Sequence, residues 1–282
     1  MRELPIGYID SGVGGLTVVK ESLKQLPNES ILFLGDNARC PYGPRSLDQV
    51  RAYIWQMTNF LREQGIKMLV VACNTGTAAA VDELKQVLKI PVVGVIASGS
   101  RAAIKQTRNN HIGVIGTQGT IQSQLYRRTI LEKSDRVTVD SLACPSFVDL
   151  VESGVPHDAE LSEHIDQVLA PLVDQGIDTL VLGCTHYPHL QAEIQKAVGS
   201  GVTLIDSGVE TVNEVSMLLD YFNLSRSADE ARANPPYQIY YTTGSVDSFK
   251  EMAGKWLRDP LLDVRGCQIR GEMINEITNS KS

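Results

Sequence analysis

The chain has 282 residues, 43% of them hydrophobic and 21% charged, a composition that is typical of globular proteins with a buried core and excludes a disordered chain. The 33 acidic and 26 basic residues give a net charge of −7, and no run of five basic residues occurs, so we expect no nucleic-acid partner. The longest uncharged stretch in the middle of the chain, residues 68–81, is too short to span a bilayer, so we expect no membrane partner.

The N-terminus and the cysteines indicate the compartment. Residues 1–5 are charged and lead directly into a strand-like segment, which is not the pattern of a signal peptide. Five scattered cysteines, an odd number, do not suit a disulfide framework. We therefore expect a cytoplasmic protein with reduced thiols.

Short apolar runs with little alternation recur along the chain, as expected for parallel strands that are covered on both faces. We predict strands at residues 6–10, 31–36, 68–72, 91–96, 112–116, 179–183 and 202–206. Between them, apolar residues recur at helical intervals of three and four within residues 50–61, 161–172 and 190–198. This alternation of strands and helices predicts an α/β fold with parallel sheets.

The C-terminal part of the chain has a weaker pattern. We expect strands at residues 238–242 and 264–269, a helix around residues 248–257 and a loop at residues 223–236.

An internal repeat is the most informative feature of the sequence. Residues 61–75 (LREQGIKMLVVACNT) align with residues 172–186 (LVDQGIDTLVLGCTH), each residue lying 111 positions before its counterpart, and Cys73 aligns with Cys184. The strand at 91–96 pairs with residues 202–207 at the same offset, and residues 6–9 (IGYI) match residues 112–115 (IGVI). The collinear matches indicate a duplicated α/β unit.

The repeat predicts where the site lies. Each repeated strand ends at a cysteine, and ligands bind at the carboxyl ends of strands in open α/β sheets. We therefore predict two pseudo-symmetric parallel-sheet α/β domains with the active site in the cleft between them, and with Cys73 and Cys184 on opposite walls. We place a discontinuous first domain at residues 1–97 plus 208–282 and the second domain at residues 98–207.

Several common motifs are absent. The sequence has no C-x-x-C, no H-E-x-x-H and no G-x-x-x-x-G-K-[ST], and residues 10–15 (DSGVGG) only begin like a dinucleotide fingerprint. Cys184 and His186, with His189 nearby, fit no common structural zinc spacing, so we expect no metal site. Cys144 and Cys267 lie in apolar settings and are predicted to be core thiols, while Cys40 lies in a polar loop and is given no role.

The remaining features favour acid/base chemistry by two thiols. The glycines of residues 10–15 can turn backbone N–H groups toward an anion at a helix N-terminus. Cys73 and Cys184 both lie at strand-to-helix turns, where the positive end of the helix dipole favours a thiolate, and Asp10 and His186 can move protons to and from them. Two such groups on opposite faces of one carbon suit the inversion of a stereocentre, because one removes a proton and the other delivers one.

At these residues the chain resembles the glutamate racemases of the cofactor-independent aspartate/glutamate racemase superfamily. The matching blocks, which span almost the whole chain in order, are residues 10–15 (DSGVGG), 35–43 (GDNARCPYG), 72–75 (ACNT), 143–154 (ACPSFVDLVESG), 183–188 (GCTHYP) and 206–207 (DS). The resemblance implies that Cys73 is the acid/base for the D enantiomer and Cys184 for the L enantiomer.

The resemblance also implies roles for the residues around the two thiols. Proton helpers would be Asp10, His186, Glu152 and Asp36. Substrate contacts would come from Asp10, Ser11, Pro41, Tyr42, Gly43, Asn74, Thr75, Thr117, Thr185 and His186. It implies glutamate as the substrate and a role in supplying D-glutamate for peptidoglycan and hence cell-wall synthesis. It also implies a homodimer that uses neither a metal nor pyridoxal phosphate. In agreement, the blocks contain no lysine that could form a Schiff base.

Other functions stay open at this point. Aspartate racemase, or a related racemase of the superfamily, would use the same chemistry in a pocket of different size. A non-catalytic amino-acid binding module would use the same cleft without exchanging the α-proton. A thiol-redox protein would instead link Cys73 to Cys184 on oxidation.

Overall fold

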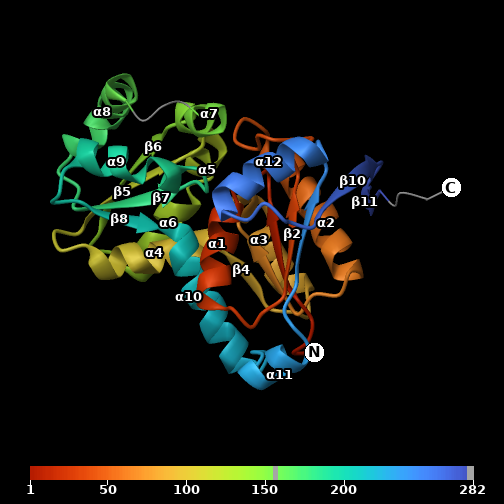
Figure 1. Cartoon of the computed structure of the whole chain (residues 1–282). Helices are drawn as coiled ribbons and strands as arrows, with labels where there is room; N and C mark the ends of the chain where they lie inside the picture. Colours follow the sequence, from red (N-terminus) through yellow and green to blue (C-terminus); the bar gives the residue numbers. More distant parts are fainter. Residues whose placement is uncertain (155–157, 278–282) are drawn as a thin grey trace.

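Two separate β-sheets organise the chain (Figure 1). The computed structural model describes residues 1–154 and 158–277. In this part of the chain a seven-stranded sheet has the order β11-β10-β9-β2-β1-β3-β4, and a four-stranded sheet has the order β6-β5-β7-β8. Neighbouring strands are parallel throughout, apart from the antiparallel pair β10–β11. The predicted α/β fold with two parallel sheets is thereby confirmed.

The first unit comprises the seven-stranded sheet and its helices. Its strands are β1 (Ile6–Asp10), β2 (Ile31–Gly35), β3 (Met68–Val71), β4 (Val92–Gly94), β9 (Gln238–Thr242), β10 (Val264–Arg270) and β11 (Met273–Glu276). Its helices are α1 (Leu16–Gln25), α2 (Leu47–Glu63), α3 (Asn74–Val87), α11 (Ala228–Ala233) and α12 (Val246–Leu257). β1, β2 and β3 are buried at every residue, because apolar clusters cover both faces of the sheet.

The second unit comprises the four-stranded sheet and its helices. Its strands are β5 (His111–Gly116), β6 (Thr138–Ala143), β7 (Thr179–Gly183) and β8 (Thr203–Asp206). Its helices are α5 (Gln118–Gln122), α6 (Leu125–Lys133), α7 (Ser146–Ser153), α8 (Ala159–Val173), the 3₁₀ helix Tyr187–Leu190 and α9 (Gln191–Val198). The strand order β6-β5-β7-β8 repeats the order β2-β1-β3-β4 of the first unit, which is the architecture that the internal repeat predicts.

Two helices carry the chain between the units (Figure 1). Helix α4 (Val95–Gln106) leads from β4 into β5, and α10 (Ser207–Tyr221) leads from β8 back to the first unit. They are joined by Glu214, whose carboxylate accepts hydrogen bonds of 2.5 Å from both Ser98 and Arg101. The predicted domain boundary between residues 97 and 98 falls within α4, and the one between residues 207 and 208 falls in the first turn of α10. Both boundaries stay a prediction.

Three elements differ from the sequence-based expectation, each for a local reason. β6 is a half-exposed strand with polar residues, so it lacks the apolar run that marks the other parallel strands. Within the expected loop at residues 223–236, α11 is started by a capping box in which Ser227 and Glu230 satisfy each other's backbone N–H groups. β11 is an edge strand that pairs only with β10. None of the helices in the described ranges is both long and apolar enough to cross a membrane.

A buried ion pair anchors the first unit at the end of the sheet opposite the turn that follows β1. The Lys67 ammonium contacts the Glu29 carboxylate and donates to the carbonyl oxygens of Arg2 and Leu224 at 2.8 and 2.9 Å. The other carboxylate oxygen of Glu29 accepts the backbone N–H of Arg226 at 2.8 Å. Four segments that are distant in the sequence therefore meet at one carboxylate and one ammonium group, which satisfy each other in the interior.

Replacement of Glu29 by alanine is expected to destabilise the protein by about 3–5 kcal/mol, because it leaves the Lys67 ammonium buried without a counter-charge. Urea unfolding monitored by circular dichroism measures this change. The matched control is Glu251→Ala, which removes an exposed partner of Lys255 and should leave the unfolding midpoint unchanged. Equal midpoints for Glu29→Ala and the control would contradict the anchoring role.

Candidate active site

A small cavity lies between the two units, where the turns after β1, β3 and β7 meet. Its volume is about 30 Å³, enough for roughly two water molecules. It is lined by Ser11, Cys40, Pro41, Tyr42, Gly43, Cys73, Asn74, Thr75, Thr117, Val148, Cys184, Thr185 and His186. The two aligned cysteines therefore contribute to one cavity, as the repeat predicts, and most of the predicted substrate-contacting residues surround them.

Cys73 lies at the boundary between a strand and a helix. It is the N-cap residue of α3, and its Sγ accepts the backbone N–H of Gly76 at 3.3 Å. Its thiol also lies 3.8 Å from the hydroxyl of Ser11. Burial, with the nearby Asp10 carboxyl as the next cause, raises the pKa of Cys73 despite these hydrogen bonds, so the thiol is protonated. Cys73 is therefore ready to donate a proton, and becomes a base only after it has done so.

Cys184 has a different set of neighbours. It directly follows β7, and its Sγ lies 3.8 Å from Nδ1 of His186. The other ring nitrogen, Nε2, lies 3.0 Å from a carboxylate oxygen of Glu152, which comes from α7. Burial opposes a charged imidazole, but the hydrogen bonds to Cys184 and Glu152 outweigh it and raise the pKa of His186 to about 10. The row Glu152–His186–Cys184 can thus hold a proton beside the sulfur.

Asp10 is fully buried behind the cavity. One of its carboxylate oxygens accepts the backbone N–H groups of Gly12 and Gly15 at 3.1 and 2.9 Å. The other oxygen, Oδ1, has no hydrogen-bond partner among the described residues, and burial raises the pKa of this carboxyl. The expectation that this glycine-rich turn offers its N–H groups to an external anion is thus corrected, because two of them bind the carboxylate of Asp10 itself.

Asp36 lies away from the cavity lining. Its buried carboxylate accepts hydrogen bonds from Arg39 at 2.6 Å, from Thr243 at 2.7 Å and from the hydroxyl of Tyr42. These three donors occupy the carboxylate, which therefore holds the loop that carries Tyr42 and Gly43 into the cavity. This arrangement favours a positioning role for Asp36 over the predicted role of proton helper.

Hydroxyl groups from both units meet at one side of the cavity. Thr75 lies 2.9 Å from Thr117 and 3.2 Å from Thr120, and the latter two are 3.1 Å apart. Close by, the backbone N–H of Gly119 donates to the carbonyl of Gly43 at 2.9 Å. Sequence reasoning missed Thr120; the capping residue of α5 is Thr117, whose hydroxyl accepts the backbone N–H of Thr120.

The two units approach each other closely at Gly14. A Cβ atom at this position would lie 2.2 Å from Oγ1 of Thr185 and 2.6 Å from Cε1 of His186. Thr17, on the following turn of the same segment, donates to the carbonyl of Thr185 at 3.2 Å. Gly14, the second glycine of the motif, is thus needed for contact with the turn that carries Cys184.

The other cysteines are placed partly as expected. Cys144 and Cys267 are buried in apolar clusters, which confirms them as core thiols. Cys40, to which the sequence assigns no role, lines the cavity together with Val148. Its thiol is half-buried, and burial, followed by the nearby Glu152 carboxylate, raises its pKa to about 12.

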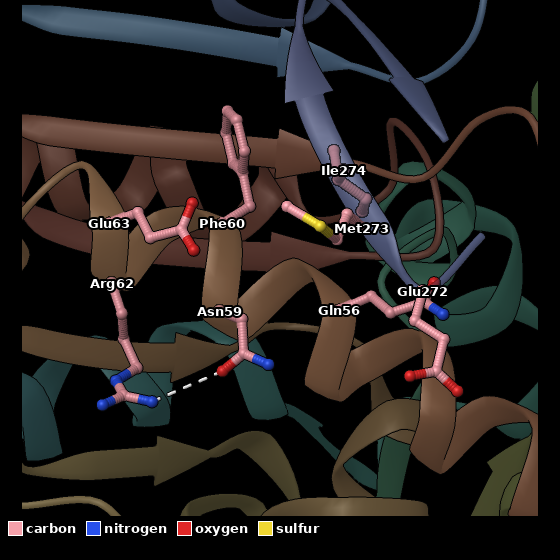
Figure 2. A pocket seen from close by; sticks show the side chains of 8 residues that line it. All are labelled: Gln56, Asn59, Phe60, Arg62, Glu63, Glu272, Met273 and Ile274. Carbon is pink, nitrogen blue, oxygen red and sulfur yellow. Dashed lines mark hydrogen bonds between the residues drawn. The ribbon is translucent and has the colours of Figure 1, made fainter. Parts of the chain in front are cut away.

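A larger hollow of about 420 Å³ lies elsewhere, between α2 and the β10–β11 hairpin (Figure 2). Its lining has an Arg62–Asn59 hydrogen bond of 3.3 Å and two carboxylates, Glu63 and Glu272, but neither cysteine nor histidine. It therefore lacks the residue types that the repeat singles out. In the part of the chain that the structure describes, no group of three or more His, Cys, Asp or Glu side chains is placed to hold a metal ion.

Two α/β units that each present a thiol to one cavity define the class of protein. The chain belongs to the Asp/Glu/Hydantoin racemase family, whose model matches residues 7–215.

Within this family the chain is most informatively compared with glutamate racemases. It is 56% identical over 261 residues to the glutamate racemase of Carnobacterium sp. (strain St2). This alignment covers 92% of this chain and 96% of that protein. The crystal structure of a glutamate racemase from Bacillus anthracis superposes with a TM-score of 0.90 at 43% identity, covering 97% of this chain and all of that one. The glutamate racemase of Francisella tularensis, solved in complex with D-glutamate, gives a TM-score of 0.86 at 32% identity over 96% and 98% of the two chains.

Replacement of Glu152 by glutamine is expected to lower the pKa of His186 from about 10 toward its ordinary value of 6.5, because the charged acceptor of Nε2 is lost. A raised pKa means that the folded protein binds the His186 proton more tightly than the unfolded chain does. This contribution to the free energy of unfolding is complete below pH 6.5 and is lost as the pH rises through about 10. The variant should therefore also be less stable than the wild type at neutral pH. Nitrogen-15 NMR titration of the imidazole checks the shift. Glu163→Gln, on exposed α8, is the control; an unchanged His186 titration in Glu152→Gln would contradict the assignment.

Proposed function

We propose that this protein interconverts L- and D-glutamate, with the thiols of Cys73 and Cys184 as the acid/base pair, and supplies D-glutamate for peptidoglycan synthesis. The observation that carries the proposal is that two cysteines from equivalent strand ends of a duplicated architecture line one cavity. The glutamate racemases that match over nearly the whole chain support the choice of substrate.

The reaction consists of two proton transfers. The thiolate on one side removes the α-proton of the bound amino acid and becomes a thiol, leaving the electron pair on the α-carbon. The thiol on the other side then gives its proton to the opposite face of that carbon and becomes a thiolate. In our assignment Cys184 takes the proton from L-glutamate and Cys73 delivers one to form D-glutamate; the reverse reaction exchanges the two roles. Both transfers are made by the chain's own thiols.

The neighbours of each thiol support this assignment. Cys73 carries its proton, as delivery to the carbon in the L-to-D direction requires. Cys184 has the charged His186 ring at 3.8 Å, which can exchange a proton with its sulfur, and Glu152 holds that ring in place. We assign Asp10 as the corresponding proton helper of Cys73, because its carboxyl lies near enough to raise the pKa of that thiol and its Oδ1 has no hydrogen-bond partner among the described residues. Glu152 then acts through His186, and Asp36 acts through Tyr42.

The substrate carries two carboxylates, yet the described residues that line the cavity include no arginine or lysine. We assign their binding to neutral donors, namely the hydroxyls of Ser11, Thr75, Thr117 and Thr185, the amide of Asn74 and the backbone N–H groups of Tyr42 and Gly43; Pro41, which has no N–H, contributes only to the wall of the cavity. Such fixed dipoles in a site without bulk water stabilise the charge that develops when the α-proton leaves.

The volume of the cavity implies motion. The cavity between the thiols is narrow, at about 30 Å³. We infer that the two units move apart to admit glutamate and close over it again before the proton transfers. The α4–α10 connection is the place where such a movement would bend. A homodimer, as the resemblance implies, remains part of the proposal without an assigned interface.

Incubation of the purified protein with L-glutamate in deuterated water, without added cofactor, is expected to yield D-glutamate that carries deuterium at the α-carbon. At early times the remaining L-glutamate should stay unlabelled, because a different thiol serves each enantiomer. Proton NMR and chiral chromatography measure the two quantities, with aspartate as the comparison substrate. Absence of exchange would indicate a binding module, and faster turnover of aspartate would indicate an aspartate racemase; either outcome overturns the proposal.

The variant Cys73→Ala should lose turnover in both directions by at least about 100-fold, while glutamate binding, measured by calorimetry, is retained. The control is Cys267→Ala, which removes a buried thiol in β10 that lies outside the cavity. Racemization that persists in Cys73→Ala at the rate of the control would refute the mechanism with two thiols.

A further inference from the structure

The side-chain amide of Asn74 has a hydrogen-bond partner for its oxygen but, among the described residues, none for its nitrogen. It is the first residue of α3, directly after Cys73, and it is buried at 3% exposure while lining the cavity. Its carbonyl oxygen Oδ1 accepts a hydrogen bond of 2.7 Å from the hydroxyl of Tyr126. Its amide nitrogen Nδ2 is buried and has no partner among the described residues. A buried donor of this kind beside a cavity is a candidate ligand contact.

Tyr126 does not line the cavity itself. It belongs to α6 of the second unit, so its hydrogen bond to Asn74 passes from one unit to the other. Its hydroxyl lies where the connecting helices meet, beside Ser207 at the start of α10, and a Cβ at Gly99 of α4 would lie 3.5 Å from it. Burial raises the pKa of Tyr126, so the phenol keeps the proton that it donates.

We propose that Tyr126 is a positioning residue, which fixes the amide of Asn74 so that its N–H groups face a carboxylate of the bound substrate. The two ends of an asparagine amide have nearly the same shape but opposite hydrogen-bonding character. Only the orientation with Oδ1 on Tyr126 presents donors to an anion; the flipped amide would present an acceptor and repel it. The proposal rests on the proposed function, since it takes a carboxylate as the ligand.

The hydrogen bond also joins the two units beside the site, because Tyr126 belongs to the second unit and Asn74 to the first. Tyr126 therefore acts on the substrate through Asn74, without lining the cavity itself.

The test is the variant Tyr126→Phe, which removes one hydroxyl. We expect kcat/KM for glutamate to fall roughly 3- to 10-fold, the effect of one buried hydrogen bond, and mainly through a higher KM, because the Asn74 contact is made with the bound substrate. The matched control is Tyr8→Phe, which removes an equally buried hydroxyl that lies 2.7 Å from Ser22 and outside the cavity; its KM should equal that of the wild type. An unchanged KM in Tyr126→Phe would overturn the proposal.

A double variant separates positioning from general loosening. In an Asn74→Ala background, Tyr126→Phe should have no further effect on KM, and an undiminished effect there would overturn the proposal. Asn74→Asp provides a test that keeps the Tyr126 hydrogen bond and therefore the fold; it exchanges the donor for an acceptor and should raise KM more than Tyr126→Phe does. If the wild-type protein turns over no glutamate, the proposed function fails. Calorimetry with D-glutamate still tests the positioning role in that case: Tyr126→Phe should bind it more weakly than Tyr8→Phe does, and equal binding would overturn the proposal.

Discussion

The close approach of two polypeptide turns at Gly14 is the constraint on which the site depends. Inversion by two thiols requires that the turns after β3 and β7, which carry Cys73 and Cys184, face one cavity, and the turn after β1 packs against the turn after β7 beside them. At Gly14 the space for even one methyl group is absent, because Thr185 and His186 already occupy it. Residues that are separated by 171 or more positions thus meet at a distance that only glycine permits. The remaining contacts between the units, including the threonine hydroxyls and the Gly43–Gly119 hydrogen bond, maintain this approach.

Much of this architecture follows from periodicity. The strands at residues 6–10, 179–183 and 238–242 are observed with the predicted bounds, since buried parallel strands have continuous apolar runs. The offset between Cys73 and Cys184 predicted that both thiols reach one cavity, because repeated units place equivalent residues at equivalent strand ends. A duplicated sequence therefore carries information about three-dimensional placement that a single strand or helix does not.

What could not be predicted are the partners that come from elsewhere in the fold. Arg39 and Tyr42 follow Asp36 closely in the sequence, but nothing near Asp36 indicates that Thr243, from beyond β9, is the third donor to its carboxylate. The Tyr126–Asn74 hydrogen bond joins the two units and leaves no periodic signal in the sequence. The glycine-rich turn also misled the sequence-based interpretation, since the pattern is the same whether its N–H groups bind a ligand or the adjacent Asp10.

The two thiols, although equivalent by duplication, have unlike surroundings: a carboxyl group lies near Cys73, and an imidazole held by Glu152 lies beside Cys184. Mirror-image amino acids have the same free energy in water, so the equilibrium constant of their exchange is one. Thermodynamics therefore forces kcat/KM to be equal in the two directions, however different the proton carriers are. Any advantage that the imidazole gives to one direction in kcat has to reappear as a proportionally weaker apparent affinity for that enantiomer. The asymmetry of the site can thus decide which enantiomer saturates the enzyme first, but never which one accumulates.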